Sequence, residues 1–448
     1  MGKYFGTDGV RGVANSELTP ELAMKLGKAG AYVLTKTSST PKILVAVDSR
    51  RSGDMLAAAL SAGLCSVGTN VCLAGIVPTP AVAYLVRHYG FDAGVMISAS
   101  HNPMADNGIK FFNHLGFKLP DALENEIESC MENQAKPPCP IGQDVGITLP
   151  CPTAEKDYLT YLLSTVEGLN LKGMKIALDC ANGATSYIAP KVFSALGADV
   201  HNLSNTPNGI NINENCGSTH MEALAQYVKD NALEIGIAFD GDGDRMLAVD
   251  GNGISVQGDE ILAIIGTDLK ERGLLTKNTI VATTMSNQGL EVMCKQHGII
   301  LHRADVGDRY VLEKMLDNDL SLGGEQSGHV IFRDYSTTGD GILTALKLVE
   351  VISNKGKPLE ELKTVMENFP QVLVNVIISN DKKRQWCDNP IIMSHYNELQ
   401  GRLAGEGRIL VRPSGTEPLV RVMIEGRDDG EIQVMADSLA ATIRDTLV

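Results

Sequence analysis

Short apolar runs of strand length alternate along most of the chain with longer segments that repeat apolar residues at helical spacing. The runs predict buried strands at residues 43–47, 93–97, 176–178, 235–239, 247–249 and 280–284. A helical pattern follows the first run near residues 54–67, and turns rich in glycine, asparagine or aspartate border the others. This alternation predicts α/β layers with parallel or mixed sheets.

The last part of the chain has a different pattern. An apolar strand is predicted at residues 371–379 and is followed by a polar stretch. Two shorter strands, at residues 408–411 and 419–425, then precede a final helix that begins at Asp429. Strands that lead into one helix predict a small α+β domain.

Three interruptions of these patterns divide the chain. Five prolines gather in a linker at residues 134–152, and further breaks fall near residues 250–258 and 368–370. We therefore expect α/β domains at residues 1–150, 151–252 and 253–367, and the α+β domain at residues 368–448. The similar lengths of the first three domains predict a repeated architecture, although their sequences show no clear self-similarity.

Charge limits the partners of this protein. The 448 residues carry 39 basic and 54 acidic side chains, a formal net charge of −15. A field of that sign repels polyanions, so we expect neither nucleic acid nor an anionic membrane as the main partner. The one basic run, Lys382-Lys383-Arg384, is interpreted as solvated surface.

The sequence also predicts a compartment. It has no run of about 18 apolar residues, and its first residues lack the apolar core of a signal peptide. The nine cysteines are odd in number and none has C-x-x-C spacing, so we expect reduced thiols rather than disulfides or a zinc site. These features together predict a cytoplasmic protein.

A polar loop follows the predicted strand at residues 93–97. It contains Ser100 and His101, and Asn102-Pro103 favours a turn. Because α/β folds bind ligands at the carboxyl ends of strands, Ser100 is a candidate nucleophile. The alternative is that Ser100 only caps the turn. A hydrolase is disfavoured because the G-x-S-x-G elbow is absent.

Asp240, Asp242 and Asp244 alternate with glycines directly after the predicted strand at residues 235–239. The glycines permit a tight turn around one hard cation, and three carboxylates with few other donors suit Mg²⁺. An EF-hand is excluded, because Arg245 and Gly251 stand where its glycine and glutamate are needed. An acidic surface turn is the alternative, but crowded carboxylates without a cation repel one another.

A glycine-rich loop at residues 323–329 contains Glu325, Ser327 and His329. The first two can hydrogen-bond sugar hydroxyls, and Glu325 could equally face the ammonium group of an amino sugar. His329 could exchange a proton near neutral pH, or it could be a buried structural histidine.

The loop at residues 412–418 has the features of a phosphate site. Ser414, Gly415 and Thr416 offer backbone N–H groups and hydroxyls, and Arg412 and Arg421 offer forked donors that match phosphate oxygens. A Walker A loop is excluded because its pattern is absent, and an ordinary polar turn is the alternative. A glycine-rich turn near the N-terminus ends in Arg11, which could neutralise charge beside the reacting phosphoryl group. Together these loops hold what phosphoryl transfer on a sugar phosphate requires.

The four main loops, at residues 98–103, 240–245, 324–329 and 412–416, resemble the signature loops of the α-D-phosphohexomutase superfamily in order and spacing. The resemblance covers essentially the whole chain. It implies four domains around a central cleft, three of them with one α/β fold and a smaller α+β domain that closes over the substrate phosphate.

The resemblance also implies a role for each loop residue. Ser100 would be phosphorylated and would bind one Mg²⁺ per chain together with Asp240, Asp242 and Asp244, a ligand set that suits Mn²⁺ as well. Lys110 and His329 would be the general acid and base. The other catalytic residues would be Arg11, His101 and Arg245. The substrate would contact Glu325, Ser327, Arg412, Ser414, Gly415, Thr416 and Arg421.

Two features are similar to the branch that acts on glucosamine phosphates: the opening stretch at residues 4–12, and Gln326, where relatives acting on mannose or glucose phosphates usually carry methionine. The implied reaction interconverts glucosamine 6-phosphate and glucosamine 1-phosphate through a 1,6-bisphosphate, for amino-sugar nucleotide and cell-wall precursor synthesis. The expected partner is thus a small-molecule sugar phosphate, and the resemblance also implies a homodimer.

Three other functions remain open at this point. The nearest is a phosphomannomutase/phosphoglucomutase with the same chemistry. A metal-dependent phosphomonoesterase would use the same serine but end with water. A regulator that binds sugar phosphates without catalysis is disfavoured by the intact Ser100, Lys110 and aspartate loop.

Overall fold

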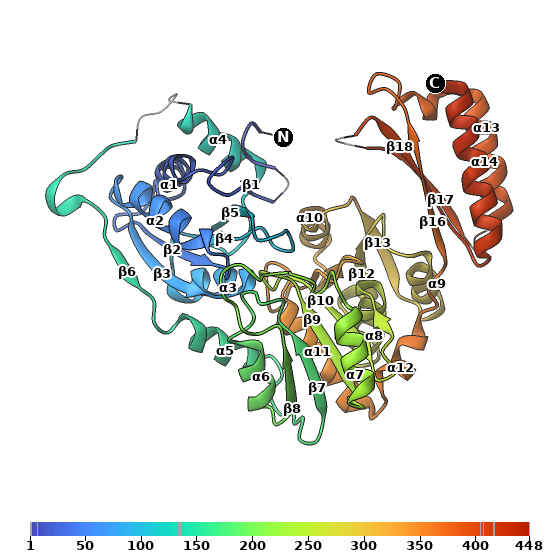
Figure 1. Ribbon diagram of the computed structural model, residues 1–448, viewed down its shortest axis with the longest axis horizontal. Coiled ribbons are helices and arrows are strands. Elements are labelled where there is room, and N and C mark those ends of the chain that lie inside the picture. The colour runs from blue at the N-terminus through green and yellow to red at the C-terminus, as the bar shows by residue number, and fades with distance from the viewer. Residues whose placement is uncertain are drawn as a thin grey trace. The chain divides into compact units, whose positions relative to one another are not determined.

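The computed structural model describes residues 2–6, 8–132, 137–403, 405, 407–414 and 417–447. The chain forms two compact units (Figure 1). The larger unit contains Met1–Met285 and Ile299–Thr364, and the smaller unit contains Ser286–Gly298 and Val365–Val448.

The first sheet of the larger unit has the strand order β1-β5-β4-β2-β3-β6. Its strands are β1 (Val10–Val13), β2 (Lys42–Val47), β3 (Asn70–Ile76), β4 (Ala93–Ile97), β5 (Asp106–Asn113) and β6 (Thr148–Pro150). The helices of this region are α1 (Pro20–Leu34), α2 (Ser52–Cys65), α3 (Thr79–Tyr89) and α4 (Asp121–Met131).

The second sheet has the order β11-β10-β9-β7-β8. Its strands are β7 (Lys175–Asp179), β8 (Asp199–Leu203), β9 (Ile235–Phe239), β10 (Met246–Asp250) and β11 (Ser255–Val256). The helices α5 (Ala154–Ser164), α6 (Ala189–Ala195) and α7 (Glu222–Asp230) belong to this part of the chain.

The third sheet has the order β13-β12-β14-β15. Its strands are β12 (Thr279–Thr283), β13 (Ile300–Ala304), β14 (Leu322–Gly324) and β15 (Val330–Phe332). The accompanying helices are α8 (Gly258–Glu271), α10 (Asp308–Asn318), α11 (Gly341–Lys355) and α12 (Leu359–Leu362).

Short 3₁₀ helices occur at several places along the chain: η1 (Gly142–Asp144), η2 (Thr276–Asn278), η3 (Lys363–Val365) and η4 (Gln385–Asp388).

The three sheets share one four-strand topology, seen in β5-β4-β2-β3, β10-β9-β7-β8 and β15-β14-β12-β13. In each set the first strand in sequence pairs in parallel with the second and third, and the third pairs antiparallel with the fourth. The predicted α/β class and repeated architecture are thus confirmed. In every repeat, the turn between the third and fourth strands is a predicted functional loop.

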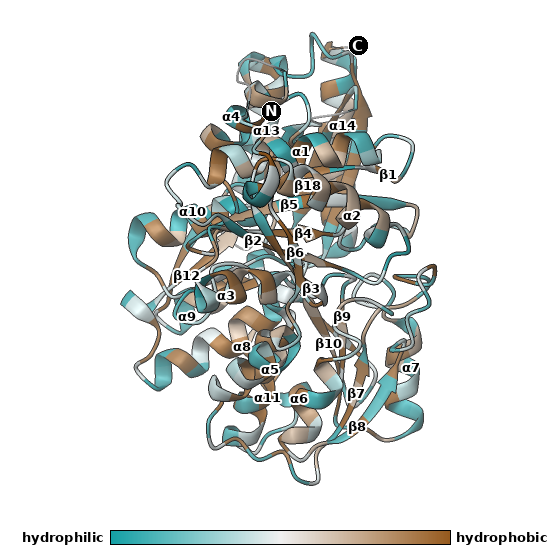
Figure 2. Ribbon diagram, turned by 90° about the vertical axis from the view of Figure 1, so that its left-hand side faces the viewer, coloured by the Kyte–Doolittle hydropathy of each residue, from teal (hydrophilic) through white to brown (hydrophobic). Residues whose placement is uncertain are grey.

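Burial explains why the sequence pattern predicted the central strands. Every residue of β4, β9 and β12 is buried, so each strand appears as a continuous apolar run. β9 and β10 are accordingly brown in Figure 2. Among the described residues, no helix combines the length and hydrophobicity that a membrane span requires. In the part of the chain that the structure describes, no two cysteines are joined by a disulfide bond.

The smaller unit contains a three-stranded antiparallel sheet of order β16-β18-β17. Its elements are β16 (Gln371–Ile377), β17 (Arg408–Pro413), β18 (Leu419–Glu425), α9 (Gln288–Gln296), α13 (Pro390–Leu403) and α14 (Asp429–Leu447). The sheet and α14 form one apolar core, against which the half-buried Trp386 packs. The predicted α+β class and the final helix from Asp429 are confirmed.

Three details of the sequence interpretation were wrong. The end of the predicted linker is the strand β6, which pairs in parallel with β3 and extends the first sheet. The stretch expected to be merely polar after β16 contains α13. Lys383 is buried rather than solvated, because its Nζ donates to the carbonyls of Ser414 at 2.6 Å and Glu417 at 3.3 Å.

Two glycines allow α1 and α2 to pack closely. A Cβ atom on Gly27 would lie 2.3 Å from the carbonyl oxygen of Leu60, and one on Gly63 would lie 2.1 Å from that of Met24. Backbone atoms cannot move aside as a flexible side chain can, so the two helices would have to separate.

We predict that Gly27→Ala lowers the free energy of unfolding by about 1–3 kcal/mol, the usual cost of overpacking. Thermal and urea unfolding would measure it. The control is Gly401→Ala in α13, where a new Cβ meets open space; there the better helix propensity should add about 0.5–1 kcal/mol of stability. Equal effects of the two substitutions would contradict the close helix contact.

Candidate active site

Ser100 lies in the turn after β4 in a backbone conformation that is unusual for serine. Its φ is +52°, in the left-handed region, and the residue is buried. The Ser100 N–H donates to Oγ of Ser98 at 2.9 Å, and that hydroxyl donates to Oδ2 of Asp48 at 2.6 Å. A conformation of this kind persists only where the surroundings impose it, and such positions concentrate at active sites.

Arg50 imposes this conformation, and the sequence interpretation missed it. The buried guanidinium is held by Asp48, with Nε 2.8 Å from Oδ2. Its remaining N–H groups donate to the backbone carbonyls of four loop residues: Ser100, Asn102, Pro103 and Asp106. The available signal was an arginine two residues after an aspartate at the carboxyl end of a predicted strand.

The serine loop also contacts the aspartate loop directly. A Cβ on Gly241 would lie only 2.4 Å from the carbonyl oxygen of Ser100, so glycine is required there. Asn213 donates to the carbonyls of Ser100 at 2.9 Å and Asn102 at 3.0 Å. These contacts bring the turns of the first and second repeats together.

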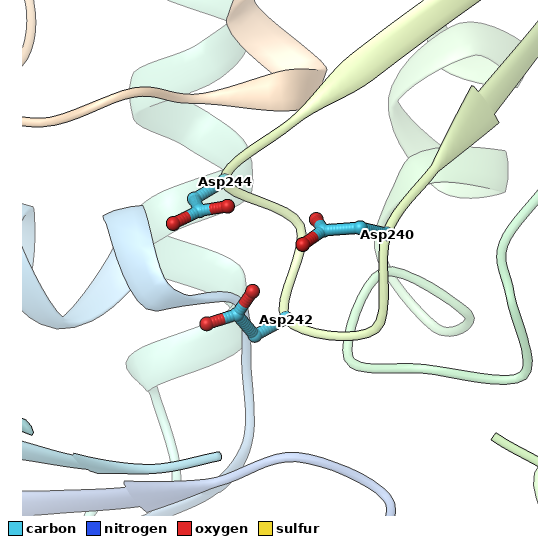
Figure 3. A group of neighbouring side chains, drawn as sticks. All are labelled: Asp240, Asp242 and Asp244. Carbon is cyan, nitrogen blue, oxygen red and sulfur yellow. The ribbon is translucent and has the colours of Figure 1, made fainter. Parts of the chain in front are cut away.

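Asp240, Asp242 and Asp244 point toward one another from the turn between β9 and β10 (Figure 3). All three are buried, and one carboxylate oxygen from each lies within 4.8 Å of the others. The Ser100 hydroxyl donates to Oδ2 of Asp240 at 2.5 Å. The predicted nucleophile and the predicted metal ligands therefore meet.

The electrostatics of this cluster fit a divalent cation. Burial, together with the charges of Asp244 and Asp242, raises the pKa of Asp240 well above its usual value. Among the described residues, Oδ1 of Asp242 and Oδ1 of Asp244 are buried and have no hydrogen-bond partner. Converging, unpartnered carboxylate oxygens are the donors that Mg²⁺ prefers.

Lys110 forms an ion pair with one member of this cluster. Its buried Nζ is 2.8 Å from Oδ2 of Asp242 and 2.9 Å from Oδ2 of Asp8. Burial alone would lower the pKa of Lys110, but the two carboxylates outweigh it and raise the pKa. Burial likewise acts against the charged form of Asp242, but Lys110 keeps the pKa of that carboxyl low.

Arg11, His101 and Arg245 also lie close to the Ser100 turn. Nδ1 of His101 is 3.3 Å from the Ser100 hydroxyl and 3.4 Å from an Nη atom of Arg245. Burial, then Arg245 and Arg11, lower the pKa of His101. Arg11 forms an ion pair with Asp8 and lies close to the carbonyl oxygen of Ala99. A phosphate on Ser100 would thus be next to two guanidinium groups.

The turn of the third repeat faces a cleft of about 1070 Å³. The cleft is lined by several predicted site residues: Arg11, His101, Asp244, Arg245, Glu325, Ser327 and His329. The Ser327 hydroxyl is buried without a partner among the described residues, and Oε1 of Glu325 accepts from the Gly307 N–H at 3.2 Å. Unsatisfied polar atoms at a cleft wall are suited to sugar hydroxyls.

His329 faces two carboxylates. Its Nε2 lies 3.6 Å from Oδ2 of Asp308 and 3.9 Å from Oδ2 of Asp244. Asp8, Lys118 and Asp308 also line the cleft and were missed by the sequence interpretation. Asp8 stood in a noted glycine-rich turn, but no local pattern distinguished Lys118 or Asp308.

The predicted phosphate loop lies in the smaller unit. Arg412 and Arg421 are direct partners across β17 and β18, and burial together with Arg421 lowers the pKa of Arg412. Arg421 is held 2.7 Å from a carboxylate oxygen of Glu417, and Lys383 fixes the Ser414 carbonyl. Gly415 and Thr416 lie outside the described residues. Adjacent guanidinium groups repel each other, and an anion between them relieves that repulsion.

Four domain models of the phosphoglucomutase/phosphomannomutase family match in order: α/β/α domain I at residues 2–137, domain II at 156–253, domain III at 257–369 and the C-terminal domain at 373–442. The chain belongs to this family of the α-D-phosphohexomutase superfamily, whose enzymes isomerise sugar phosphates by phosphoryl transfer.

Curated relatives place the chain in one branch of that family. The phosphoglucosamine mutase of Acetivibrio thermocellus is 56% identical over 449 residues, covering 100% of both chains. That of Ruminiclostridium cellulolyticum is 55% identical over 449 residues, again covering 100% of both. The branch is therefore that of the phosphoglucosamine mutases.

Solved structures show the same fold at low identity. A phosphoglucomutase/phosphomannomutase family protein from Burkholderia thailandensis superposes with a TM-score of 0.82 at 23% identity, covering 99% of this chain and 97% of that one. The Aspergillus fumigatus N-acetylphosphoglucosamine mutase, solved with GlcNAc-6P and magnesium, has a TM-score of 0.70 at 18% identity, covering 99% and 96%.

We predict that Arg50→Lys lowers the kcat for sugar phosphate isomerisation about 100-fold, since a misplaced reacting group has an effect of that size. Lysine keeps the charge but cannot donate to four carbonyls at once. Steady-state kinetics and a thermal melt would separate loss of activity from unfolding. Arg51→Lys, on the exposed neighbouring residue, should leave kcat unchanged.

Proposed function

We propose that this chain interconverts glucosamine 6-phosphate and glucosamine 1-phosphate, for amino-sugar nucleotide and cell-wall precursor synthesis, through a phosphoserine at Ser100. The observation that carries the proposal is the Ser100 hydroxyl, which lies 2.5 Å from Oδ2 of Asp240, one of three buried carboxylates that converge. The close relatives named phosphoglucosamine mutase support the choice of sugar.

In the first half-reaction, phosphorylated Ser100 donates its phosphoryl group to O1 of glucosamine 6-phosphate. The bond between phosphorus and Oγ breaks and a bond between phosphorus and O1 forms. A general base accepts the O1 proton, and a general acid gives a proton to the released Oγ. The product is glucosamine 1,6-bisphosphate, which also serves as an activator. A Mg²⁺ ion held by the phosphoserine, Asp240, Asp242 and Asp244 would neutralise charge on the transferring group.

Before the second half-reaction the bisphosphate reorients in the cleft so that its O6 phosphate faces Ser100. Ser100 then takes the phosphoryl group from O6. Lys110 and His329 are the proposed acid and base. Arg11, Arg245 and His101 lie around Ser100 and stabilise the negative charge of the transferring group.

Binding of the sugar and of its second phosphate is assigned to separate loops. Glu325 and Ser327 bind the sugar hydroxyls or the amino group. Arg412, Ser414, Gly415, Thr416 and Arg421 bind the phosphate that is not reacting. Because the two phosphates exchange places, that site must accept either one, which suits several donors better than a single rigid contact.

We further propose the domain boundaries 1–150, 151–252, 253–367 and 368–448, a cytoplasmic location and a homodimer. The alternative function is a phosphomannomutase/phosphoglucomutase, which the same loops could perform on another sugar.

The test is a substrate panel with purified protein, Mg²⁺ and a trace of sugar bisphosphate. Glucosamine 6-phosphate should be isomerised orders of magnitude faster than glucose 1-phosphate or mannose 1-phosphate. Faster turnover of glucose or mannose phosphate would support the alternative. Release of inorganic phosphate in place of an isomer would indicate a phosphomonoesterase.

In the same assay Ser100→Ala should abolish isomerisation and should lack phosphoserine by mass spectrometry, while keeping the wild-type melting temperature. More than a few per cent of wild-type activity in this variant would contradict the phosphoserine mechanism.

We predict that removing the metal with EDTA abolishes activity and that Mg²⁺ restores it. Asp242→Asn should lower kcat and shift the Mg²⁺ titration to higher concentration, because one charged ligand is lost. Asp199→Asn, on an exposed residue of β8, is the matched control and should titrate like the wild type. An unchanged titration for Asp242→Asn would remove that residue from the metal site.

A further inference from the structure

Lys118 joins two parts of the cleft that are far apart in sequence. Its Nζ lies 2.6 Å from Oδ1 of Asp8 and 2.6 Å from Oδ2 of Asp308. Lys118 follows β5 of the first repeat, whereas Asp308 is the first residue of α10 in the third. The three side chains are each about four-fifths buried at the cleft wall.

Each carboxylate that binds Lys118 also contacts a candidate acid or base. Oδ2 of Asp8 is 2.9 Å from Nζ of Lys110, and the same Asp308 oxygen that binds Lys118 is 3.6 Å from Nε2 of His329. A continuous series of polar contacts therefore links Lys110 in the first repeat to His329 in the third.

All three members of this link stay charged. Burial would raise the pKa values of Asp8 and Asp308, but the neighbouring cations, Lys118 among them, hold both below their usual values. Burial would lower the pKa of Lys118, but Asp308 and Asp8 raise it well above its usual value. Mutual ion pairing therefore keeps them in place.

We propose that Asp8, Lys118 and Asp308 are positioning residues, which set the placement of Lys110 relative to His329 during phosphoryl transfer. The inference rests on the proposed function, because it takes Lys110 and His329 as the acid and base. Phosphoryl transfer depends mainly on positioning, so an error of about 1 Å between these groups would slow it greatly. The local sequence around Lys110 or His329 cannot set the distance between them, because the two residues lie in different repeats.

The competing role for Lys118 is direct binding of a substrate phosphate. The two roles differ in kinetics. A phosphate ligand supports substrate binding, so its loss raises KM, whereas loss of a positioning residue lowers kcat with KM little changed.

The experiment compares Lys118→Met, Asp308→Asn and the double variant with the wild type in the isomerisation assay. We expect kcat to fall about 100-fold in Lys118→Met with KM little changed. The double variant should lose no more than Lys118→Met, because both substitutions break the same link. Lys118→Arg, which can still bridge two carboxylates, should recover most of the activity.

The matched control is Lys363→Met. Lys363 forms a similar ion pair: its Nζ lies 2.6 Å from Oδ2 of the buried Asp250. Neither residue lines the cleft. Its loss should lower the melting temperature and leave kcat unchanged. Lys118→Met should differ from it by losing kcat even where the melting temperature is kept.

Three outcomes would overturn the proposal: an unchanged kcat in Lys118→Met, a rise in KM at constant kcat, or no recovery by Lys118→Arg. If Lys118→Met leaves a buried carboxylate unpaired and fails to fold, the double variant, which removes both charges, provides the kcat and KM. If the wild type prefers glucose 1-phosphate, the proposed sugar fails but the same comparison on that substrate still tests the link.

Discussion

Negative charge in a small buried volume is the constraint on which the rest of the site depends. Asp240, Asp242 and Asp244 converge while buried from solvent, and burial alone would protonate them or drive them apart. Lys110 beside Asp242 and Arg245 beside Asp244 compensate part of that charge, and a divalent cation fits the oxygens that remain. The compensating groups come from different repeats, so the charge balance exists only when the larger unit is folded.

The repeated topology allows such a site to be assembled. Each repeat places the turn between its third and fourth strands at the carboxyl end of a buried parallel strand. The first turn holds the proposed nucleophile, the second holds the three carboxylates, and the third faces the cleft with Glu325 and His329. The same arrangement of strand, turn and strand thus occurs three times, and the side chains on the three turns differ in their chemistry.

The sequence predicted the parts of the site whose signal is local. The aspartate loop is visible because three carboxylates at alternate positions after a strand repel one another unless they share a cation. Ser100 is visible because it follows the end of a buried run. Lys118 and Asp308 were not visible, because they pair across 190 residues and only the folded topology brings them together. Arg50 gave only the weak signal of its neighbour Asp48, because the carbonyls that it binds lie at least 50 residues further along the chain. Lys383 was assigned to the surface by its basic neighbours, although its ammonium group donates to two carbonyls of the predicted phosphate loop.

The position of Trp386 has a practical consequence. It is the only tryptophan of the chain, and it packs against the core of the smaller unit beside Tyr396, with ring centroids 6.2 Å apart. Its intrinsic fluorescence therefore reports on the smaller unit, whereas circular dichroism sums the helices of both. Denaturation curves from the two probes coincide only if the units unfold as one cooperative block. Trp386 fluorescence thus distinguishes unfolding of the unit that holds the proposed phosphate loop from unfolding of the unit that holds the proposed nucleophile.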